Sequence, residues 1–566
     1  MRLSLPALAA LAALVGNVHA IQRVTRTGRF LYQEDGTRFF IKGIGYQPQG
    51  EVLEADDNHF NEPGTFIDPL ADAEGCARDL PNLQAANVNT VRVYSVDSSL
   101  NHDECMRLLS EADIHVILDL SLPVIASIDR TVPSWSTNIM NTYLATIEVF
   151  DKYDNILAYN IGNEVLDNIE TSIPALPYLK AATRDIKAYL RSIGSERLVG
   201  YASIDGDLTF RKAVADFLSC GSDDTAIDIY GLNEYSWCGA GGSLETSRYT
   251  SNIEQFTDYN VVTYFSEYGC VSGGARPWTE VDVLLGEEMG AVWSGGIAFS
   301  YFPAQANDGK FGMVTISADN STATPSADLE ALGERYGANT GPALPAQADA
   351  EATVYPACVA VTGASLTLPG TPNNEACNCL FESLSCRVAS AVADDLDIVG
   401  PLIGTACDLL DGEGLDCDSG IGGNGATGVY ARISGCDPAT KLSYVFSQYY
   451  ESQDRLASAC DFSGNATVNA AASAADTAEA QGESCIASPS ATSVPGGGSR
   501  PSAQPSSPVP SAGTPSGGNG GSPSAAPANP SQTGRGNGAG GAREGLAAVG
   551  VLLAGVAGTF GALLVL

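Results

Sequence analysis

Eight short apolar segments recur between residues 39 and 302, and most are continuous runs rather than alternations of apolar and polar residues. Continuous runs are typical of strands buried on both faces, as in a parallel sheet. Segments with helical spacing, such as 76–86 and 176–193, lie between them. The expected strands are 39–46, 88–94, 115–120, 156–161, 198–202, 227–232, 261–265 and 297–302.

Eight strands with helical crossovers predict an α/β fold, a (β/α)8 TIM barrel that spans residues 21–340. An open, doubly wound sheet is the alternative. No glycine-rich phosphate loop opens a helix in this stretch, which favours the barrel over the open sheet.

The remainder of the chain divides by composition. Residues 341–374 are a predicted linker, and residues 375–487 contain eight of the 14 cysteines. Residues 488–545 consist mainly of Ser, Pro, Gly and Ala, which cannot bury enough apolar surface to offset the entropy of ordering. We therefore expect a small disulfide-rich α+β domain followed by a flexible stalk.

Both ends of the sequence resemble targeting signals. Residues 1–20 combine a charged start, a short apolar run and the small residues of a signal peptidase site, although a buried first helix is an alternative. Residues 546–566 form an apolar tail behind the small-residue cluster 536–540, which predicts removal of the tail and a GPI anchor at Asn537. A simple tail anchor is the alternative. The expected location is the extracellular face of the plasma membrane and the cell wall.

Composition agrees with an extracellular protein. An even cysteine count suits a disulfide framework, and Asn320 and Asn465 begin glycosylation sequons. The formal net charge of −37 argues against nucleic acid as a partner, because phosphates require a basic face. The few histidines lack the spacing of metal ligands, so we expect neither a metal nor another cofactor.

In a TIM barrel the chemistry lies where strands end, at their carboxyl edge. The residues at these ends are acidic, amide-bearing and aromatic, a combination that suits a sugar site with two carboxyl groups around a glycosidic bond. They are Gln47, Tyr94, Asp119, Asn163, Glu164, Asn233, Glu234, Tyr235, Glu267 and Tyr301.

Two of these carboxyl groups compete for one role. Glu164 and Glu234 each follow an asparagine at a strand end, so spacing alone leaves both open. Position favours Glu164, because a glutamate after the fourth strand faces Glu267 of the seventh strand across the barrel mouth.

Several motifs resemble the fungal β-1,3-glucanosyltransferases of glycoside hydrolase family 72. The resemblance is ordered over about 300 residues, and it lies in residues 43–47, 91–94, 101–106, 130–135, 159–165, 231–238, 265–270 and 299–302. It implies that Glu164 is the general acid/base and Glu267 the nucleophile. It further implies that Gln47, Tyr94, Asp119, Asn163, Tyr235 and Tyr301 bind substrate. The family pattern has no fixed acid at Glu234.

The resemblance also implies a retaining reaction in which the two carboxyl groups lie about 5–5.5 Å apart. The partners would be β-1,3-glucan chains, one as donor and one as acceptor, and the protein would contact the membrane only through its anchor. An endo-β-1,3-glucanase would share every catalytic residue, and a wall adhesin without catalysis is a third hypothesis.

The cysteine-rich stretch resembles the family 43 carbohydrate-binding modules, through Cys377, Cys379, Cys386 and residues 441–450. Tyr444, Phe446, Tyr449 and Tyr450 there could stack on sugar or fill the core. The resemblance implies the disulfide pairs Cys76–Cys105, Cys220–Cys358, Cys238–Cys270, Cys377–Cys436, Cys379–Cys485, Cys386–Cys460 and Cys407–Cys417.

Overall fold

The computed structural model describes residues 21–52, 63–123, 126–168, 171–304, 311–473 and 476–486. The predicted signal peptide, stalk, apolar tail and anchor residue Asn537 lie outside these ranges. In the described ranges, no helix combines the length and apolar character that a membrane span needs. All described residues belong to one compact unit of the chain.

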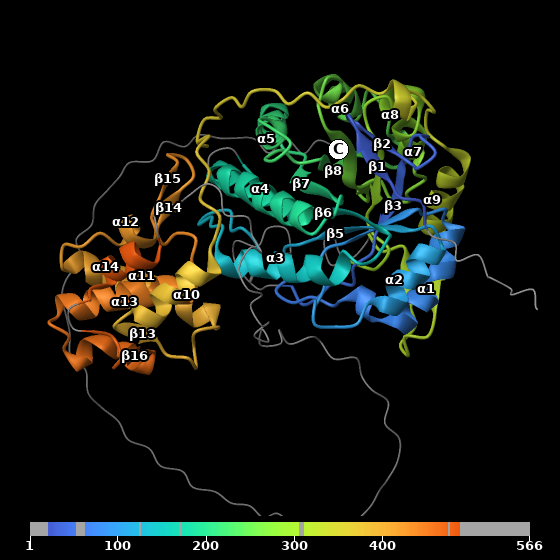
Figure 1. Ribbon diagram of the computed structural model, residues 1–566. Coiled ribbons are helices and arrows are strands. Elements are labelled where there is room, and N and C mark those ends of the chain that lie inside the picture. Colours follow the sequence, from blue (N-terminus) through green and yellow to red (C-terminus); the bar gives the residue numbers. More distant parts are fainter. Residues whose placement is uncertain are drawn as a thin grey trace, which may run out of the picture. The chain divides into compact units, whose positions relative to one another are not determined.

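Eight parallel strands close into a barrel in the order β10-β3-β4-β5-β6-β7-β8-β9 (Figure 1). Each predicted strand overlaps one of these strands, which confirms the (β/α)8 barrel and rules out the open sheet. The strands are β3 Ile41–Gly45, β4 Thr90–Val93, β5 His115–Asp119, β6 Ile156–Asn163, β7 Leu198–Ile204, β8 Ile229–Cys238, β9 Val262–Cys270 and β10 Gly295–Ala298.

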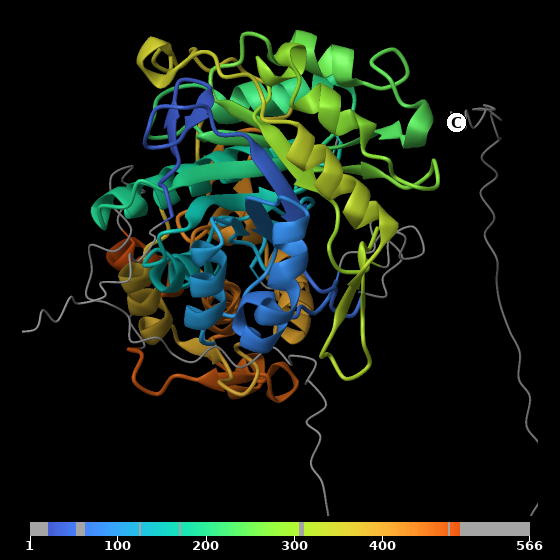
Figure 2. The same ribbon diagram turned by 90° about the vertical axis from the view of Figure 1, so that its right-hand side faces the viewer.

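Helices connect the strands and surround them (Figures 1 and 2). Several begin at an aspartate that accepts backbone N–H groups, as Asp72 does before α1 and Asp207 before α5, which satisfies donors that a helix start leaves open. The helices are α1 Ala73–Ala85, α2 Asp103–Glu111, α3 Thr137–Phe150, α4 Leu176–Ser192, α5 Leu208–Ser219, α6 Tyr249–Phe256, α7 Thr279–Leu284, α8 Glu287–Gly290 and α9 Ala327–Ala338.

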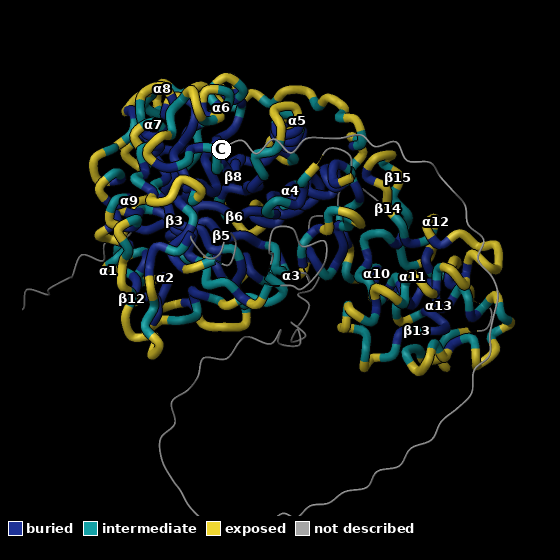
Figure 3. Tube along the Cα trace, turned by 180° about the vertical axis from the view of Figure 1, so that it is seen from behind, coloured by how far each residue is buried: buried dark blue, intermediate teal, exposed yellow. Residues whose placement is uncertain are grey.

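The inside of the barrel changes from apolar to polar along the strands. Ile117 of β5 and Ala158 of β6 belong to an apolar cluster with residues of the other strands. Two residues further along, on the same face because side chains alternate, stand Asp119 and Asn160, both buried. Most residues of the barrel strands are buried, and the trace of the barrel in Figure 3 is largely dark blue. The polar layer therefore lies at the carboxyl edge, where the functional residues were expected.

An antiparallel hairpin lies ahead of the barrel strands. It pairs β1 Thr25–Thr27 with β2 Phe30–Tyr32. Val24 and Leu31 from this segment join the apolar cluster that includes Ile117. A second hairpin, β11 Val314–Ile316 with β12 Ala323–Pro325, follows the last barrel strand.

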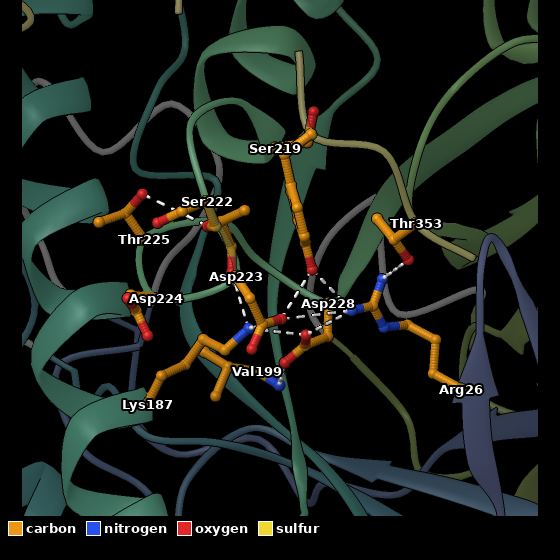
Figure 4. A network of polar contacts seen from close by, with 12 residues as sticks. Arg26, Lys187, Val199, Ser219, Ser222, Asp223, Asp224, Thr225, Asp228 and Thr353 are labelled. Carbon is orange, nitrogen blue, oxygen red and sulfur yellow. Dashed lines mark hydrogen bonds and ion pairs between the residues drawn. The ribbon is translucent and has the colours of Figure 1, made fainter. Parts of the chain in front are cut away.

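The expected linker is fastened to the barrel by a polar network (Figure 4). Asp228 accepts a hydrogen bond of 2.8 Å from Lys187 Nζ, and it lies 3.2 Å from Arg26 Nη2. The Tyr355 hydroxyl donates to Asp223 at 2.7 Å. The network comprises Arg26, Lys187, Asp223, Asp228, Thr353 and Tyr355. The Cys220–Cys358 disulfide joins the same segment to the barrel, so residues 353–358 are held by hydrogen bonds and by a covalent bond.

The cysteine-rich stretch folds as a small α+β domain around its own apolar cluster. Its helices are α10 Asn374–Ser383, α11 Leu396–Gly412, α12 Cys417–Ile421, α13 Pro438–Ser452 and α14 Ala478–Cys485, and its strands are β13 Cys386–Val388, β14 Gly423–Asn424, β15 Val429–Tyr430 and β16 Ala466–Val468. The structure pairs all 14 cysteines in the same seven bridges that the family resemblance implies.

Candidate active site

Both candidate carboxylates stand at irregularities in the barrel pairing. Along β6, the pairing with β7 takes three residue steps, from Asn160 to Asn163, where β7 takes two. Along β9, the pairing with β8 passes over Ser266, directly before Glu267. A β-bulge of this kind redirects the side chains that follow it, and bulges are common next to active sites. The bulges therefore set the direction of Glu164 and Glu267.

Glu267 is held by three hydrogen-bond donors. Its Oε1 accepts from the Tyr94 hydroxyl at 2.9 Å and from Arg92 Nη1 at 3.2 Å, and its Oε2 accepts from the Tyr235 hydroxyl at 2.7 Å. Glu267 is only 8% exposed to solvent. Burial raises the pKa of the Glu267 carboxyl, while Arg92 and the two hydroxyls oppose that rise by stabilising the ionised form. The carboxylate is thus fixed at both oxygens.

Arg92 joins three of the predicted site residues, and it was not itself predicted. Its guanidinium is fully buried and donates twice to Asp119, at 2.7 and 3.2 Å, and once to Asn163 Oδ1, at 2.9 Å. Asn160 also donates to Asp119, at 2.6 Å. A buried ion pair is favourable only when its remaining hydrogen bonds are satisfied, as they are here. An arginine in an otherwise apolar strand was the signal that could have identified it.

Glu164 receives a hydrogen bond from the neighbouring polar layer. Asn233 Nδ2 donates to Glu164 Oε1 at 2.6 Å, and Asn233 Oδ1 accepts from the Ser266 hydroxyl at 2.7 Å. Asn233 Nδ2 also donates to Asn163 Oδ1 at 3.3 Å, and the same oxygen accepts from Arg92. Arg92 in turn donates to Glu267, so one polar network connects the two carboxylates.

Glu234 lies outside this cluster, although it directly follows Asn233. Side chains alternate along β8, so Asn233 reaches the polar layer while Glu234 faces the helices. Its oxygens accept from Ser236 N and from Asn252 Nδ2, both at 2.7 Å. Burial, followed by the charge of Asp205, raises the pKa of the Glu234 carboxyl. The structure thus separates the two acids that spacing alone left open.

Gln47 contacts the backbone of the segment that carries Tyr94. Its Oε1 accepts from the backbone N–H groups of Tyr94 and Ser95, both at 3.1 Å. Its Nε2 donates to the Ile67 carbonyl at 2.6 Å. Because both ends of the amide are engaged with backbone, Gln47 fixes the segment that carries Tyr94.

The structure does not bring Tyr301, which was expected to bind sugar, to the two carboxylates. β10 ends at Ala298, so Tyr301 lies beyond the strand that was expected to carry it. Its side chain is fully buried, and its hydroxyl donates to Asp79 at 2.9 Å. A ring enclosed in this way presents no face to a ligand.

Two phenylalanines brace the tyrosines that hold Glu267, and sequence reasoning missed both as site residues. Phe299 meets the rings of Tyr94 and Tyr235 edge-on, with centroids 6.2 and 6.5 Å away. Phe311 packs 5.6 Å from Tyr235 and 5.2 Å from Phe299. Edge-to-face contacts of this kind stabilise aromatic clusters. Phe299 follows β10 directly, so the strand-end rule could have identified it.

In the small domain, the aromatic residues of α13 fill the core. Tyr444, Phe446 and Tyr450 are buried in its apolar cluster, and Tyr449 packs against that cluster while half-buried. Of the two hypotheses for these residues, the structure favours packing over sugar stacking.

The two sequon asparagines differ in their surroundings. Asn320 is exposed between β11 and β12, whereas Asn465 is half-buried and donates from Nδ2 to the Phe462 carbonyl at 3.0 Å. Glycosylation of both remains a prediction. Among the residues that the structure describes, no three His, Cys, Asp or Glu side chains are grouped to hold a metal ion.

Comparison with known families decides what kind of barrel this is. Residues 10–339 match the glucanosyltransferase family model of glycoside hydrolase family 72, and residues 384–467 match the X8 domain. The chain belongs to the glucanosyltransferases of glycoside hydrolase family 72. The family match ends one residue after α9 of the barrel, so it covers the whole candidate active site of this glucanosyltransferase.

Relatives with known names support the same assignment for this glucanosyltransferase. It is 37% identical over 477 residues to 1,3-beta-glucanosyltransferase gas1 of Schizosaccharomyces pombe, covering 83% of each chain. It is 36% identical over 432 residues to 1,3-beta-glucanosyltransferase GAS2 of Saccharomyces cerevisiae, covering 75% of each. A solved structure of a Saccharomyces cerevisiae Gas2p mutant, in complex with laminaritetraose and laminaripentaose, is 32% identical with a TM-score of 0.70, and the match covers 82% of this chain and 98% of that one.

Proposed function

We propose that this protein is a retaining β-1,3-glucanosyltransferase. It cleaves a β-1,3-glucan internally and joins the new reducing end to the non-reducing end of a second β-1,3-glucan. The names of the relatives support the reaction, and the laminari-oligosaccharides bound to Gas2p support the β-1,3 linkage of the substrate.

In the first step Glu267 attacks the anomeric carbon of the donor chain. The bond between that carbon and the glycosidic oxygen breaks as the bond to the Glu267 carboxylate forms. Glu164 gives its proton to the departing oxygen. The observation that carries this assignment is the set of three donors on Glu267, because it orients a carboxylate for attack.

In the second step a hydroxyl of the acceptor chain attacks the same carbon. Glu164, now ionised, accepts the hydroxyl proton, and the bond to Glu267 breaks. Water in place of the acceptor would give hydrolysis instead. A bound acceptor has an effective concentration far above that of bulk water, which favours transfer.

Trapping the intermediate tests the mechanism. A laminari-oligosaccharyl fluoride with a second fluorine at C2 of the reacting sugar should label the protein, because the C2 fluorine slows both steps while the good leaving group at C1 keeps the first step faster than the second. Proteolysis and mass spectrometry should find the sugar on Glu267. A label on Glu164 or Glu234, or no label while activity persists, would contradict the assignment.

The same proposal places the protein outside the cell, at the cell wall. The seven disulfides support this, because they persist in oxidising compartments. The GPI anchor at Asn537 remains a prediction from sequence. Release of the protein from membranes by phosphatidylinositol-specific phospholipase C would test it.

A further inference from the structure

Glu164 has a backbone conformation that its own side chain disfavours. Its φ is +49°, in the left-handed region. For a residue with a Cβ this costs on the order of 1–2 kcal/mol, so the surroundings must hold it there. Glu164 N donates to the Ala202 carbonyl at 2.9 Å, which fixes one side of the peptide.

Arg130 holds the other side. It comes from the segment between β5 and α3, and its Nη2 donates to the Glu164 carbonyl at 3.3 Å. Its Nη1 lies 3.9 Å from Asp167 Oδ2. One guanidinium thus spans the turn from residue 164 to residue 167. The side chain of Arg130 is 24% exposed, so it lies at the surface of the turn with part of its length in contact with solvent.

Tyr201 of β7 contacts the same turn. Burial raises the pKa of the Tyr201 hydroxyl first, Glu164 raises it further, and Arg130 lowers it. The same hydroxyl accepts from Leu166 N at 3.2 Å. The turn after β6 is therefore held from two directions, by Arg130 and by Tyr201.

We propose that Arg130 is a positioning residue for the acid/base step. By holding the Glu164 carbonyl, it keeps the backbone left-handed and directs the carboxyl group to Asn233 and the leaving oxygen. This inference rests on the proposed role of Glu164. Misplacement of a catalytic group by about 1 Å can cost up to roughly a hundredfold in rate.

Loss of positioning has a signature that loss of stability lacks. A sugar hydroxyl is a poor leaving group and needs the proton from Glu164, whereas 2,4-dinitrophenolate leaves without one. A misplaced acid therefore slows cleavage of a laminari-oligosaccharide but not formation of the intermediate from its dinitrophenyl glycoside. General destabilisation of the barrel slows both.

The experiment compares these two substrates for Arg130→Gln, with Arg130→Lys as the conservative variant. Arg248→Gln is the matched control, because Arg248 pairs with Asp205 at the same edge of the barrel without a hydrogen bond to Glu164 among those described. For Arg130→Gln we expect kcat on the oligosaccharide to fall about 10- to 100-fold with KM within about threefold. The rate of the initial burst of dinitrophenolate should change less than about threefold. Arg130→Lys should recover part of the lost kcat on the oligosaccharide.

Equal losses on both substrates, a loss confined to KM, or an unchanged kcat would overturn the inference. If Arg130→Gln does not fold, Arg130→Lys must show a smaller fall in kcat on the oligosaccharide, again without a change in the dinitrophenolate burst. Glu164→Gln separates this inference from the proposed function. A burst that survives in Glu164→Gln supports the acid assignment whatever Arg130 does, and a burst lost in Glu164→Gln contradicts that assignment itself.

Discussion

Tyr235 and Glu267 stand on adjacent strands, β8 and β9, and the Tyr235 hydroxyl donates to Glu267 Oε2 at 2.7 Å. The same tyrosine ring packs against Phe311, 5.6 Å away. One side chain thus connects the proposed nucleophile to the aromatic frame around it. The orientation of Glu267 depends on that frame as well as on Arg92.

Removal of either hydroxyl should move the pH profile in a defined direction. The hydrogen bonds from Tyr94 and Tyr235 lower the pKa of the Glu267 carboxyl. Tyr94→Phe and Tyr235→Phe should therefore raise that pKa, so the acid limb of kcat/KM shifts to higher pH. A hydrogen bond to a charged group contributes about 1.5–3 kcal/mol, so kcat/KM should fall at least about tenfold. A limb that shifts to lower pH would contradict the role of these hydroxyls.

The three glutamates at the strand ends should respond very differently to conversion to glutamine. Glu164→Gln and Glu267→Gln should lose activity by several orders of magnitude while the circular dichroism spectrum is unchanged. Glu234→Gln is the matched control, since it changes an acid next to Asn233 that faces away from the cluster. It should retain most of the activity. Equal losses at Glu234 and Glu164 would show that the wrong acid has been assigned.

The fold was predictable because its signal is local and repeated. Continuous apolar runs such as residues 115–120 identify buried parallel strands, and eight of them determine the barrel. The polar layer was partly predictable, because Asp119 and Asn163 stand at strand ends. Arg92 was missed because its partners come from other strands, and its place between two valines was the one local signal of a buried charge.

The site prediction was limited by how accurately the sequence locates the end of each strand. Tyr301 was assigned to the sugar site because its strand was expected to reach residue 302, but β10 ends at Ala298. The bulge at Ser266 was equally hidden, because it arises from the pairing of β9 with β8 rather than from the residues of β9.

Tyr301 should therefore act on stability rather than on acceptor binding. Tyr301→Phe removes a hydrogen bond to the buried Asp79, which should cost about 1–3 kcal/mol in the free energy of unfolding. The ratio of transfer to hydrolysis should stay unchanged. Denaturant unfolding and product analysis measure the two effects. A shift toward hydrolysis without loss of stability would contradict this prediction and support a role for Tyr301 in binding sugar.

Glu280, a buried acid outside the site, should make stability depend on pH. Burial raises the pKa of its carboxyl from 4.5 to about 7, despite the opposing charges of Arg276 and Arg335. Between these values the unfolded chain loses the proton while the folded chain keeps it, so stability falls as pH rises. Glu280→Gln should match the wild type at pH 4 and exceed it at pH 8 by about 3 kcal/mol. An advantage of equal size at both pH values would contradict this.

The most direct test of the central claim is the length of the products. The wild-type protein, given a β-1,3-linked oligosaccharide of one length, should form both shorter and longer chains from the earliest times. Mass spectrometry or chromatography of the products measures this, and Glu267→Gln should form neither. Chains longer than the substrate require transfer, because hydrolysis cannot make them. Shorter products alone, over a range of substrate concentrations, would contradict the glucanosyltransferase and establish a hydrolase.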